Sequence, residues 1–348
     1  MPTPRKRVRL RDVADHAGVS TSTVSHVING TRFVAPETRT AVTAAMEVLE
    51  FQAPRTAGLS GGAGGGRTVG LVVTGASNPY NGELLQGVEQ EAVRNGFAVM
   101  LCDSHDDPRR EADGLTTLVK HAVDAIVLAP TADWQELALP ILRKHQRPFV
   151  LVDRSSEVRC DQVSTENEAV SAALVEHLTD LGHRRVAMIA GIEGISTTRD
   201  RVSGFRAALT SAGVDHEAGQ VVPGHSSVAG GRAAALQLLG SGNPPTALFS
   251  GNNAMTVGIL LAINELRLSI PDGIAVVAFD DFEWADAMTP GLTAVAQPFF
   301  AMGAQAVQLL MRRLTDPMAP RRTIRLPAEV VHRTSCGCPR LDCPKDRW

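Results

Sequence analysis

The chain has 348 residues, of which 44% are hydrophobic and 20% are charged, and its formal net charge is −3. This hydrophobic content supports buried cores in two or three domains and excludes a disordered chain. No apolar run reaches the roughly 20 residues of a membrane-spanning helix. The basic N-terminus lacks the apolar segment of a secretory signal, so we expect a cytoplasmic protein without membrane contact.

The charge is distributed unevenly along the chain. Residues 1–60 hold eight Lys or Arg and five Asp or Glu, a balance of +3, and the remaining 26 basic and 32 acidic residues give −6. A basic N-terminal part on an acidic body indicates a polyanionic partner for that part alone. A short basic terminus that is simply solvated produces the same pattern.

The composition changes at residues 58–66, where the sequence reads GLSGGAGGG. Such a segment is typical of a flexible linker between domains. We therefore predict an N-terminal domain at 1–56, a Gly-rich hinge at 57–67, a larger domain at 68–340 and a tail at 341–348.

Three short helices are predicted before the linker. The first and the third carry apolar residues on one face, at Leu10, Val13, Ala14 and Ala17 and at Val42, Ala45, Met46 and Leu49. Pro36 stands at a helix-starting position before the third. Three such helices enclose a small all-α core.

The middle helix follows the turn in GVSTSTVSHVING, at residues 18–30. Gly18 supplies the bend, and Ser20 is a good N-cap. At 100° per residue, the face opposite the apolar one collects short polar side chains: Ser22, Ser25, His26 and Asn29. A solvated face of an ordinary three-helix bundle usually carries Lys and Glu, so this face favours the DNA-reading helix of a helix-turn-helix unit.

After the linker, short apolar runs alternate with amphipathic segments. Strands are expected at 68–73, 97–102, 124–130, 149–153, 185–191, 247–251 and 274–280, and helices at 82–95, 133–146, 167–181, 199–213 and 254–267. Continuous apolar strands separated by helices predict parallel sheets that are covered on both faces. Roughly 270 residues exceed what one core usually holds, so two α/β lobes are expected.

Motifs for enzymatic chemistry are absent from the sequence. No register of the Gly-rich segment gives G-x-G-x-x-G, and the segment precedes a strand, whereas the dinucleotide fingerprint follows one. A P-loop, a G-x-S-x-G elbow and an H-E-x-x-H pair are also missing. We therefore expect neither an enzyme nor a cofactor.

Three of the five cysteines cluster near the C-terminus in CGCPRLDC, at Cys336, Cys338 and Cys343. A zinc site normally shows a C-x-x-C pair and a second pair of ligands, and both are missing here. A solvated, reduced tail is expected rather than a metal site.

The sequence LRDVADHAGVSTSTVSHVINGTRFVAPETRTAVTAAMEVLEF resembles the headpiece of the lactose/galactose repressor (LacI/GalR) family, through D-V-A-x-x-A-G-V-S-x-x-T-V-S-x-V-x-N-G. The resemblance continues in SNPY (77–80), in GHRRVAMIAG and STTRDRVSGFRAAL (within 182–209), and in AVVAFDDFEWADAMTPGLTAVAQP (275–298). Four ordered motifs across most of the chain make it highly specific.

The resemblance implies an α/β protein with an N-terminal three-helix helix-turn-helix headpiece, a hinge, and a two-lobed domain with parallel sheets like those of periplasmic sugar-binding proteins. Lobe 1 would comprise about 68–165 and 295–325, and lobe 2 about 166–294 and 326–340. The chain would cross between the lobes near 164–167, 292–297 and 323–327, and a small effector would bind in the cleft between them.

Six cleft positions match the family: Tyr80, Asp153, Arg201, Asn252, Asp280 and Gln297. Their hydroxyl, carboxylate, guanidinium and amide groups suit a polyol such as a sugar. Two alternatives remain open, because Asp280 could cap the next helix and Arg201 could form a surface salt bridge on its own helix. Trp284 lies either near the cleft mouth or in the core.

The same comparison assigns DNA contacts to the headpiece and to one leucine in the hinge. The positions are Leu10, Arg11, Ser20, Thr21, Ser22, Thr23, Ser25, His26, Asn29, Thr38 and Leu59.

Three features depart from the family's pattern. His26 stands where the family commonly has Arg, which grips guanine with two donors. In the hinge, the minor-groove leucine position falls on Ser60, with Leu59 one residue early and helix-disfavouring glycines nearby. In the cleft, Asn253 and Gly75 stand where Asp is common, which removes negative charge.

We therefore expect a ligand-responsive repressor of carbohydrate-utilisation genes that binds a pseudo-palindromic double-stranded DNA operator as a homodimer. The tail lacks a leucine heptad, so a tetramerising coiled coil is not expected. A solute-binding protein of transport and a sugar-processing enzyme are the alternatives. The headpiece and the missing signal sequence disfavour the first, and the missing catalytic motifs disfavour the second.

Overall fold

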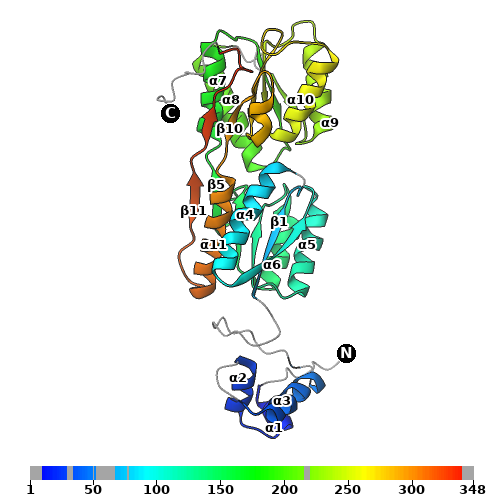
Figure 1. Cartoon of the computed structure of the whole chain (residues 1–348), viewed down its shortest axis with the longest axis vertical. Coiled ribbons are helices and arrows are strands. Elements are labelled where there is room, and N and C mark those ends of the chain that lie inside the picture. Colours follow the sequence, from blue (N-terminus) through cyan, green and yellow to red (C-terminus); the bar gives the residue numbers. More distant parts are fainter. Residues whose placement is uncertain are drawn as a thin grey trace. The chain divides into compact units, whose positions relative to one another are not determined.

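The computed structural model describes residues 10–29, 34–49, 51, 67–76, 78–214 and 220–338. The chain forms two compact units, Met1–Arg67 and Thr68–Trp348 (Figure 1). The predicted hinge with Leu59 and Ser60, and the tail with Cys343, lie outside the described residues. Within the described part of the chain, no helix has the length and apolarity needed to cross a membrane.

The first unit contains the three helices expected from the sequence: α1 (Leu10–Ala17), α2 (Thr21–Asn29) and α3 (Pro36–Val48). One buried side chain from each helix, Val13, Val24 and Val42, has no exposed surface, so the three helices share a core. The turn before α2 has the predicted chemistry. Gly18 adopts a left-handed φ of 67°, and the Oγ of Ser20 accepts a hydrogen bond from the Thr23 N–H at 3.1 Å.

Lobe 1 of the second unit is built on a six-stranded sheet of order β11-β5-β4-β3-β1-β2. Its strands are β1 (Arg67–Val73), β2 (Phe97–Asp103), β3 (Ala125–Leu128), β4 (Phe149–Asp153), β5 (Asp161–Thr165) and β11 (Thr323–Leu326). The pairs β1–β3, β3–β4, β4–β5 and β5–β11 are parallel.

Helices cover both faces of this sheet (Figure 1). They are α4 (Pro79–Arg94) and α11 (Phe299–Thr315) on one face, and α5 (Pro108–Lys120) and α6 (Trp134–Lys144) on the other. Successive residues of β3 enter the two cores alternately: Val127 packs with α4 and α11, and Ile126 and Leu128 pack with α5 and α6. This two-sided burial explains why the strands read as continuous apolar runs.

Lobe 2 has a second six-stranded sheet, of order β12-β10-β9-β8-β6-β7. Its strands are β6 (Val186–Ala190), β7 (Val221–Pro223), β8 (Ala247–Ser250), β9 (Ala275–Phe279), β10 (Thr293–Ala296) and β12 (Glu329–Val331). All the pairs are parallel except β10–β12. Its helices are α7 (Glu168–Asp180) and α8 (Ser196–Ser211) on one face, and α9 (Val228–Leu239) and α10 (Asn253–Glu265) on the other.

The chain passes between the two sheets three times. It leaves lobe 1 after β5 at Thr165, returns after β10 at Ala296, and leaves again between β11 and β12, after Leu326. All seven strands expected from the sequence form. Five further strands, β5, β7, β10, β11 and β12, are too short or too polar to stand out in a single sequence.

The expectation of a solvated C-terminal tail is wrong for Cys336. Its side chain has no exposed surface and belongs to the core of lobe 2. The Sγ atom lies 3.3 Å from His177 Nε2 and 3.3 Å from the Thr293 hydroxyl. The reason is backbone pairing beyond β12, where the Val276 N–H donates to the carbonyl of Ser335 at 2.9 Å. Within the described ranges no group of residues suits a metal ion.

The two helices on one face of the lobe 1 sheet, α4 and α11, pack closely because glycines lie at their contact. A Cβ at Gly87 would overlap the carbonyl group of Phe300, whereas a Cβ at Gly82 of the same helix would meet no atom within 4 Å. The position of Gly87 therefore has no room for a methyl group without moving backbone.

We predict that Gly87→Ala lowers the free energy of unfolding by about 1–3 kcal/mol, because the two helices must separate to admit the methyl group. The control, Gly82→Ala, should keep or raise stability, since Ala has the higher helix propensity. Urea denaturation measures both. Equal stability of the two variants would contradict the close contact.

Candidate functional site

The polar face predicted for the second helix lies on the surface of the first unit. Thr21 and Ser22 are exposed, and Ser25 and His26 are partly exposed, opposite the fully buried Val24. The other predicted DNA contacts on described residues are exposed or half-exposed as well: Leu10, Arg11, Ser20, Thr23 and Thr38. The side chain of Asn29 lies outside the described part, as does Leu59.

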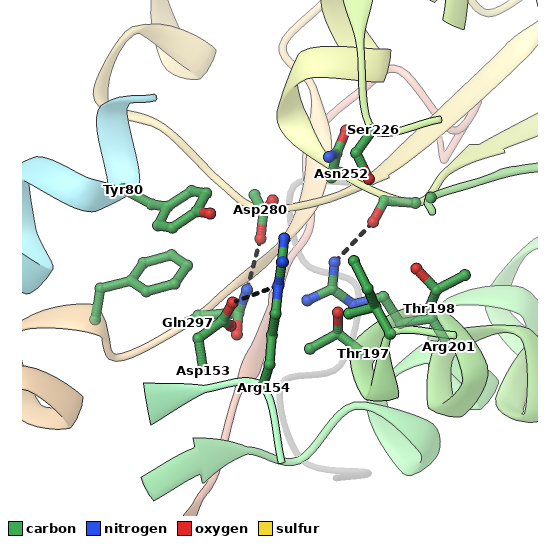
Figure 2. Close-up of a pocket in the computed structure, with 14 residues that line it drawn as sticks. Tyr80, Asp153, Arg154, Thr197, Thr198, Arg201, Ser226, Asn252, Asp280 and Gln297 are labelled. Atoms are coloured by element: carbon green, nitrogen blue, oxygen red, sulfur yellow. Dashed lines mark hydrogen bonds and ion pairs between the residues drawn. The ribbon is translucent and has the colours of Figure 1, made fainter. Parts of the chain in front are cut away.

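A polar pocket lies between the two lobes of the second unit (Figure 2). It encloses about 400 Å³ of empty space, counting its open mouth. All six positions expected in the cleft line it: Tyr80, Asp153, Arg201, Asn252, Asp280 and Gln297. The side chain of Trp284 lies outside the described residues.

The ends of parallel strands bring these side chains together. Asp153 is the last residue of β4, and Asp280 directly follows β9. Carboxyl ends of parallel strands meet at one edge of a sheet, and here the edges of both sheets border the pocket. Asp153 and Asp280 also share a left-handed backbone, with φ of 67° and 75°. Aspartate is one of the few residues other than glycine that adopts it readily.

Asp280 joins three segments of the chain. Its carboxylate accepts a hydrogen bond from the side-chain amide of Gln297 at 2.6 Å and one from the N–H of Asn253 at 3.3 Å. Asn253 begins α10, and Gln297 lies where the chain returns to lobe 1. The capping alternative supposed that Asp280 contacts the start of the next helix. Asp280 instead contacts the start of α10, which comes earlier in the chain.

Arg201 is buried, so the surface salt bridge considered from the sequence is wrong. Its Nε donates to the Asn167 side chain at 2.8 Å, and its Nη1 donates to the carbonyl of Gly251 at 2.7 Å. Its guanidinium carbon lies 3.5 Å from the centre of the Phe279 ring. Burial lowers the pKa of Arg201, and the nearby carboxylates Asp280 and Asp153 oppose that shift.

Asn252 has a structural role that directs its amide group. It is the N-cap of α10, and its Oδ1 accepts a hydrogen bond from the Met255 N–H at 2.8 Å. The side-chain oxygen is therefore used inside the lobe. The pocket-lining group that Asn252 can offer a ligand is its NH₂, which is a donor.

Two aromatic rings form one wall of the pocket. Tyr80 and Phe299 are stacked, with ring centroids 4.6 Å apart and planes inclined by 19°. Tyr80 was expected in the cleft, whereas nothing in the sequence marked Phe299, which begins α11 after a chain crossing. Burial raises the pKa of Tyr80, so its hydroxyl remains protonated and can donate a hydrogen bond.

Four further polar residues line the pocket that the sequence reasoning missed: Arg154, Thr197, Thr198 and Ser226. The sequence contained one signal for Arg154 and another for the two threonines. Arg154 directly follows Asp153 at the end of a strand, and the two threonines stand in the first turn of α8, one helical turn before Arg201. In Figure 2, Arg154 extends between Asp153 and Arg201.

The pocket holds both acidic and basic groups. Burial raises the pKa of Asp153, while the guanidinium groups of Arg154 and Arg201 oppose the shift. One nitrogen of Arg154, Nε, lies 3.8 Å from an Asp153 oxygen and has no hydrogen-bond partner although it is buried. The buried Oε1 of Gln297 also has none. Unpaired buried polar atoms are rare, and a polar ligand would satisfy them.

The two lobes also touch beside the pocket. The Asn253 amide donates a hydrogen bond to Oδ1 of Asn78, which precedes α4 in lobe 1. The N–H of Ser155 donates to the Ser196 hydroxyl at 2.8 Å. Asn253, which stands where the family commonly has Asp, thus contributes an uncharged contact between the lobes.

Glu111 does not line the pocket, and its side chain has no exposed surface. Its carboxylate accepts hydrogen bonds from the N–H of Thr131 at 2.7 Å and from the Thr131 hydroxyl at 3.2 Å. Burial raises its pKa from 4.5 to about 7, although these two hydrogen bonds and the charge of Arg154 act in the opposite direction. Glu111 therefore changes its protonation near neutral pH.

Comparison with known proteins agrees with this architecture. Residues 9–53 match the bacterial regulatory proteins of the lacI family, and residues 175–336 match a periplasmic binding protein-like domain. The ribose operon repressor of Escherichia coli K12 is 35% identical over 327 residues, which cover 94% of this chain and 99% of that protein.

Two solved structures show the same fold. A LacI family transcriptional regulator from Enterococcus faecium with bound ribose is 27% identical, with a TM-score of 0.70, over 77% of this chain and 98% of that one. The lac repressor dimer bound to operator and the anti-inducer ONPF is 27% identical, with a TM-score of 0.69, over 95% and 99%.

A helix-turn-helix unit joined to two lobes with a polar pocket between them defines a DNA-binding regulator that responds to a small molecule. The chain belongs to the lacI family of bacterial regulatory proteins. It is a transcriptional repressor and not an enzyme, so the fold class, family and class of function expected from the sequence are confirmed.

We predict that Glu111→Gln stabilises the protein at pH 8 and much less at pH 5. A carboxyl whose folded-state pKa is raised contributes stability below its unfolded pKa and loses it as the pH rises through about 7. The gain at pH 8 should be about 3 kcal/mol, from the size of the pKa shift. Urea denaturation at both pH values measures it, with Glu136→Gln, at an exposed position of α6, as the control. A gain that does not depend on pH would contradict the prediction.

Proposed function

We propose that the protein binds a pseudo-palindromic operator as a homodimer, and that an uncharged sugar such as ribose binds in the pocket between the lobes and changes operator affinity. The observation that carries the proposal is the pocket itself. It joins hydrogen-bonding groups from both lobes, and the chain that holds it also carries a helix-turn-helix unit.

The chemistry of the lining favours a sugar. The carboxylates Asp153 and Asp280 accept hydrogen bonds from hydroxyls, the Asn252 amide donates them, and the Tyr80–Phe299 pair offers an apolar surface to a sugar ring. The ribose held by the Enterococcus faecium relative, and the ribose operon named for the Escherichia coli relative, support ribose as the first ligand to test.

The lobe contacts support a mechanism of coupling. A ligand held by groups from both lobes stabilises the arrangement in which Asn253 reaches Asn78 and Ser155 reaches Ser196. Because Gln297, at one of the three chain crossings, lines the pocket, a ligand held there can favour one angle between the lobes over another. An effector with different affinities for two lobe arrangements shifts the equilibrium between them.

Dimer formation is supported by the lac repressor relative and by an apolar surface on lobe 1. Strand β2 is at the edge of its sheet, and its Leu101 is 42% exposed. Val93 of α4, the helix that packs beside β2, is 57% exposed. Two copies would place one α2 in each half-site, about 34 Å apart along the DNA. The alternative function, a solute-binding protein of transport, does not explain the presence of the helix-turn-helix unit that contains α2.

We predict that Arg201→Lys weakens ribose binding about 10- to 100-fold, because Lys cannot keep both hydrogen bonds to Asn167 and Gly251 that position this side of the pocket. Isothermal titration calorimetry measures the change. The control is Arg199→Lys, an exposed position on the same helix. Both variants should bind operator without sugar like the wild type, and unchanged ribose affinity in Arg201→Lys would refute the assignment of the pocket.

We predict that His26→Arg changes operator preference more than overall affinity. Arg can donate two hydrogen bonds to guanine, whereas His donates one, so base choice at one symmetric pair of positions should shift by about 1–3 kcal/mol. Binding to a library of operator sequences, at one fixed salt concentration, measures the preference. A uniform change across all sequences would instead make His26 a phosphate contact.

A further inference from the structure

Arg154 lines the pocket, but its two terminal nitrogens are engaged by other groups of the chain. Both terminal nitrogens donate to the carboxylate of Asp106, Nη1 at one oxygen and Nη2 at the other, the second at 2.7 Å. Nη1 also donates to the carbonyl of Pro130 at 3.0 Å. Neither Asp106 nor Pro130 lines the pocket. The terminal nitrogens of the guanidinium are therefore occupied by groups that do not line the pocket.

The loop that presents Asp106 is held in place by its backbone. His105 and Asp106 both adopt a left-handed conformation, with φ of 51° and 59°. Ser104, which is fully buried, donates its N–H and its hydroxyl to the Val73 carbonyl, and the N–H of Asp107 donates to the Ser104 carbonyl at 2.9 Å. Two consecutive left-handed residues persist only where their surroundings impose them. Asp106 is thus positioned, and it positions Arg154 in turn.

The second guanidinium of the pocket is also engaged. Arg201 donates to Asn167 and to Gly251, as described above. The carboxylates of Asp106, Asp153 and Asp280 outnumber the two guanidinium groups of Arg154 and Arg201, and the buried Glu111 interacts with Arg154 as well. A phosphate ester brings a further charge of about −1.5 to −2 near neutral pH. Its usual protein partner is a forked pair of Arg donors, which this pocket does not offer.

We propose that Asp106 makes the pocket selective for uncharged sugars over sugar phosphates, by holding the guanidinium of Arg154 to its own carboxylate. Asp106 is a positioning residue that acts through Arg154. The inference rests on the proposed function, since it concerns the same pocket. If Arg154 is released, it can reach a phosphate, and the first turn of α8, with Thr197 and Thr198 in the pocket wall, adds N–H groups that suit an anion.

The test compares ribose and ribose 5-phosphate as ligands of the full chain, by isothermal titration calorimetry. The wild type should bind ribose at least about tenfold more tightly than ribose 5-phosphate. Asp106→Asn should strengthen binding of the phosphate and lower the ratio of ribose affinity to phosphate affinity at least about tenfold. Asn is chosen because it tolerates the left-handed backbone at this position.

The matched control is Asp107→Asn, which removes the same charge one residue along the chain. Asp107 is exposed, lies outside the pocket and caps α5, a role that Asn retains. Its ratio of ribose to phosphate affinity should equal that of the wild type. The double variant Asp106→Asn with Arg154→Gln should lose the gain in phosphate binding, because the gain requires the released guanidinium.

Asp106→Gly is a second variant that also removes the carboxylate and tolerates the left-handed backbone, and it should give the same shift in ratio if Asp106→Asn does not fold. The inference is overturned if the wild type binds both ligands equally, or if neither Asp106 variant changes the ratio. In either case the proposed function stands, because ribose still binds. If the wild type binds neither ligand, the proposed function fails and the inference fails with it.

Discussion

The buried carboxylate of Asp280 is the interaction on which the pocket depends. It accepts hydrogen bonds from Gln297, at a chain crossing, and from the N–H of Asn253, at the start of α10. It thereby ties the end of β9 to a neighbouring helix and to the segment that returns to lobe 1. A carboxylate is suited to this place because it accepts several hydrogen bonds at once, and aspartate tolerates the left-handed backbone found there. The remaining pocket groups are arranged around this fixed point.

Charge balance explains how so many ionisable groups can be buried together. The charge of Asp153 interacts with those of Arg154 and Arg201, and Arg154 is in turn paired with Asp106. Buried charges are tolerated when they are paired and hydrogen-bonded. Where relatives commonly carry a further Asp, this chain has Asn253, whose amide bridges to Asn78 of the other lobe. Closure of the pocket therefore includes an uncharged contact, and no additional carboxylate has to be desolvated.

Much of this organisation could be predicted from the sequence, because it depends on local patterns. The seven apolar strands form as expected, and the cleft positions, among them Asp153 and Asp280, line the pocket because strand ends meet at one edge of a sheet. What escaped prediction depends on distant pairings. Arg154 meets Asp106 only because two left-handed residues turn the loop after β2, and Phe299 meets Tyr80 only because α11 crosses back to α4. Cys336 is buried because a segment without an apolar pattern pairs with β9.

The central claim is that a sugar between the lobes and an operator on the helix-turn-helix units act on one equilibrium. Linkage requires each ligand to change the affinity of the other by the same factor. The most direct measurement is the affinity of ribose for the free protein and for the protein saturated with operator, alongside operator affinity with and without ribose. We expect the two ribose affinities to differ by at least about fivefold and operator affinity to change by an equal factor. Equal ribose affinity in the two states would contradict it.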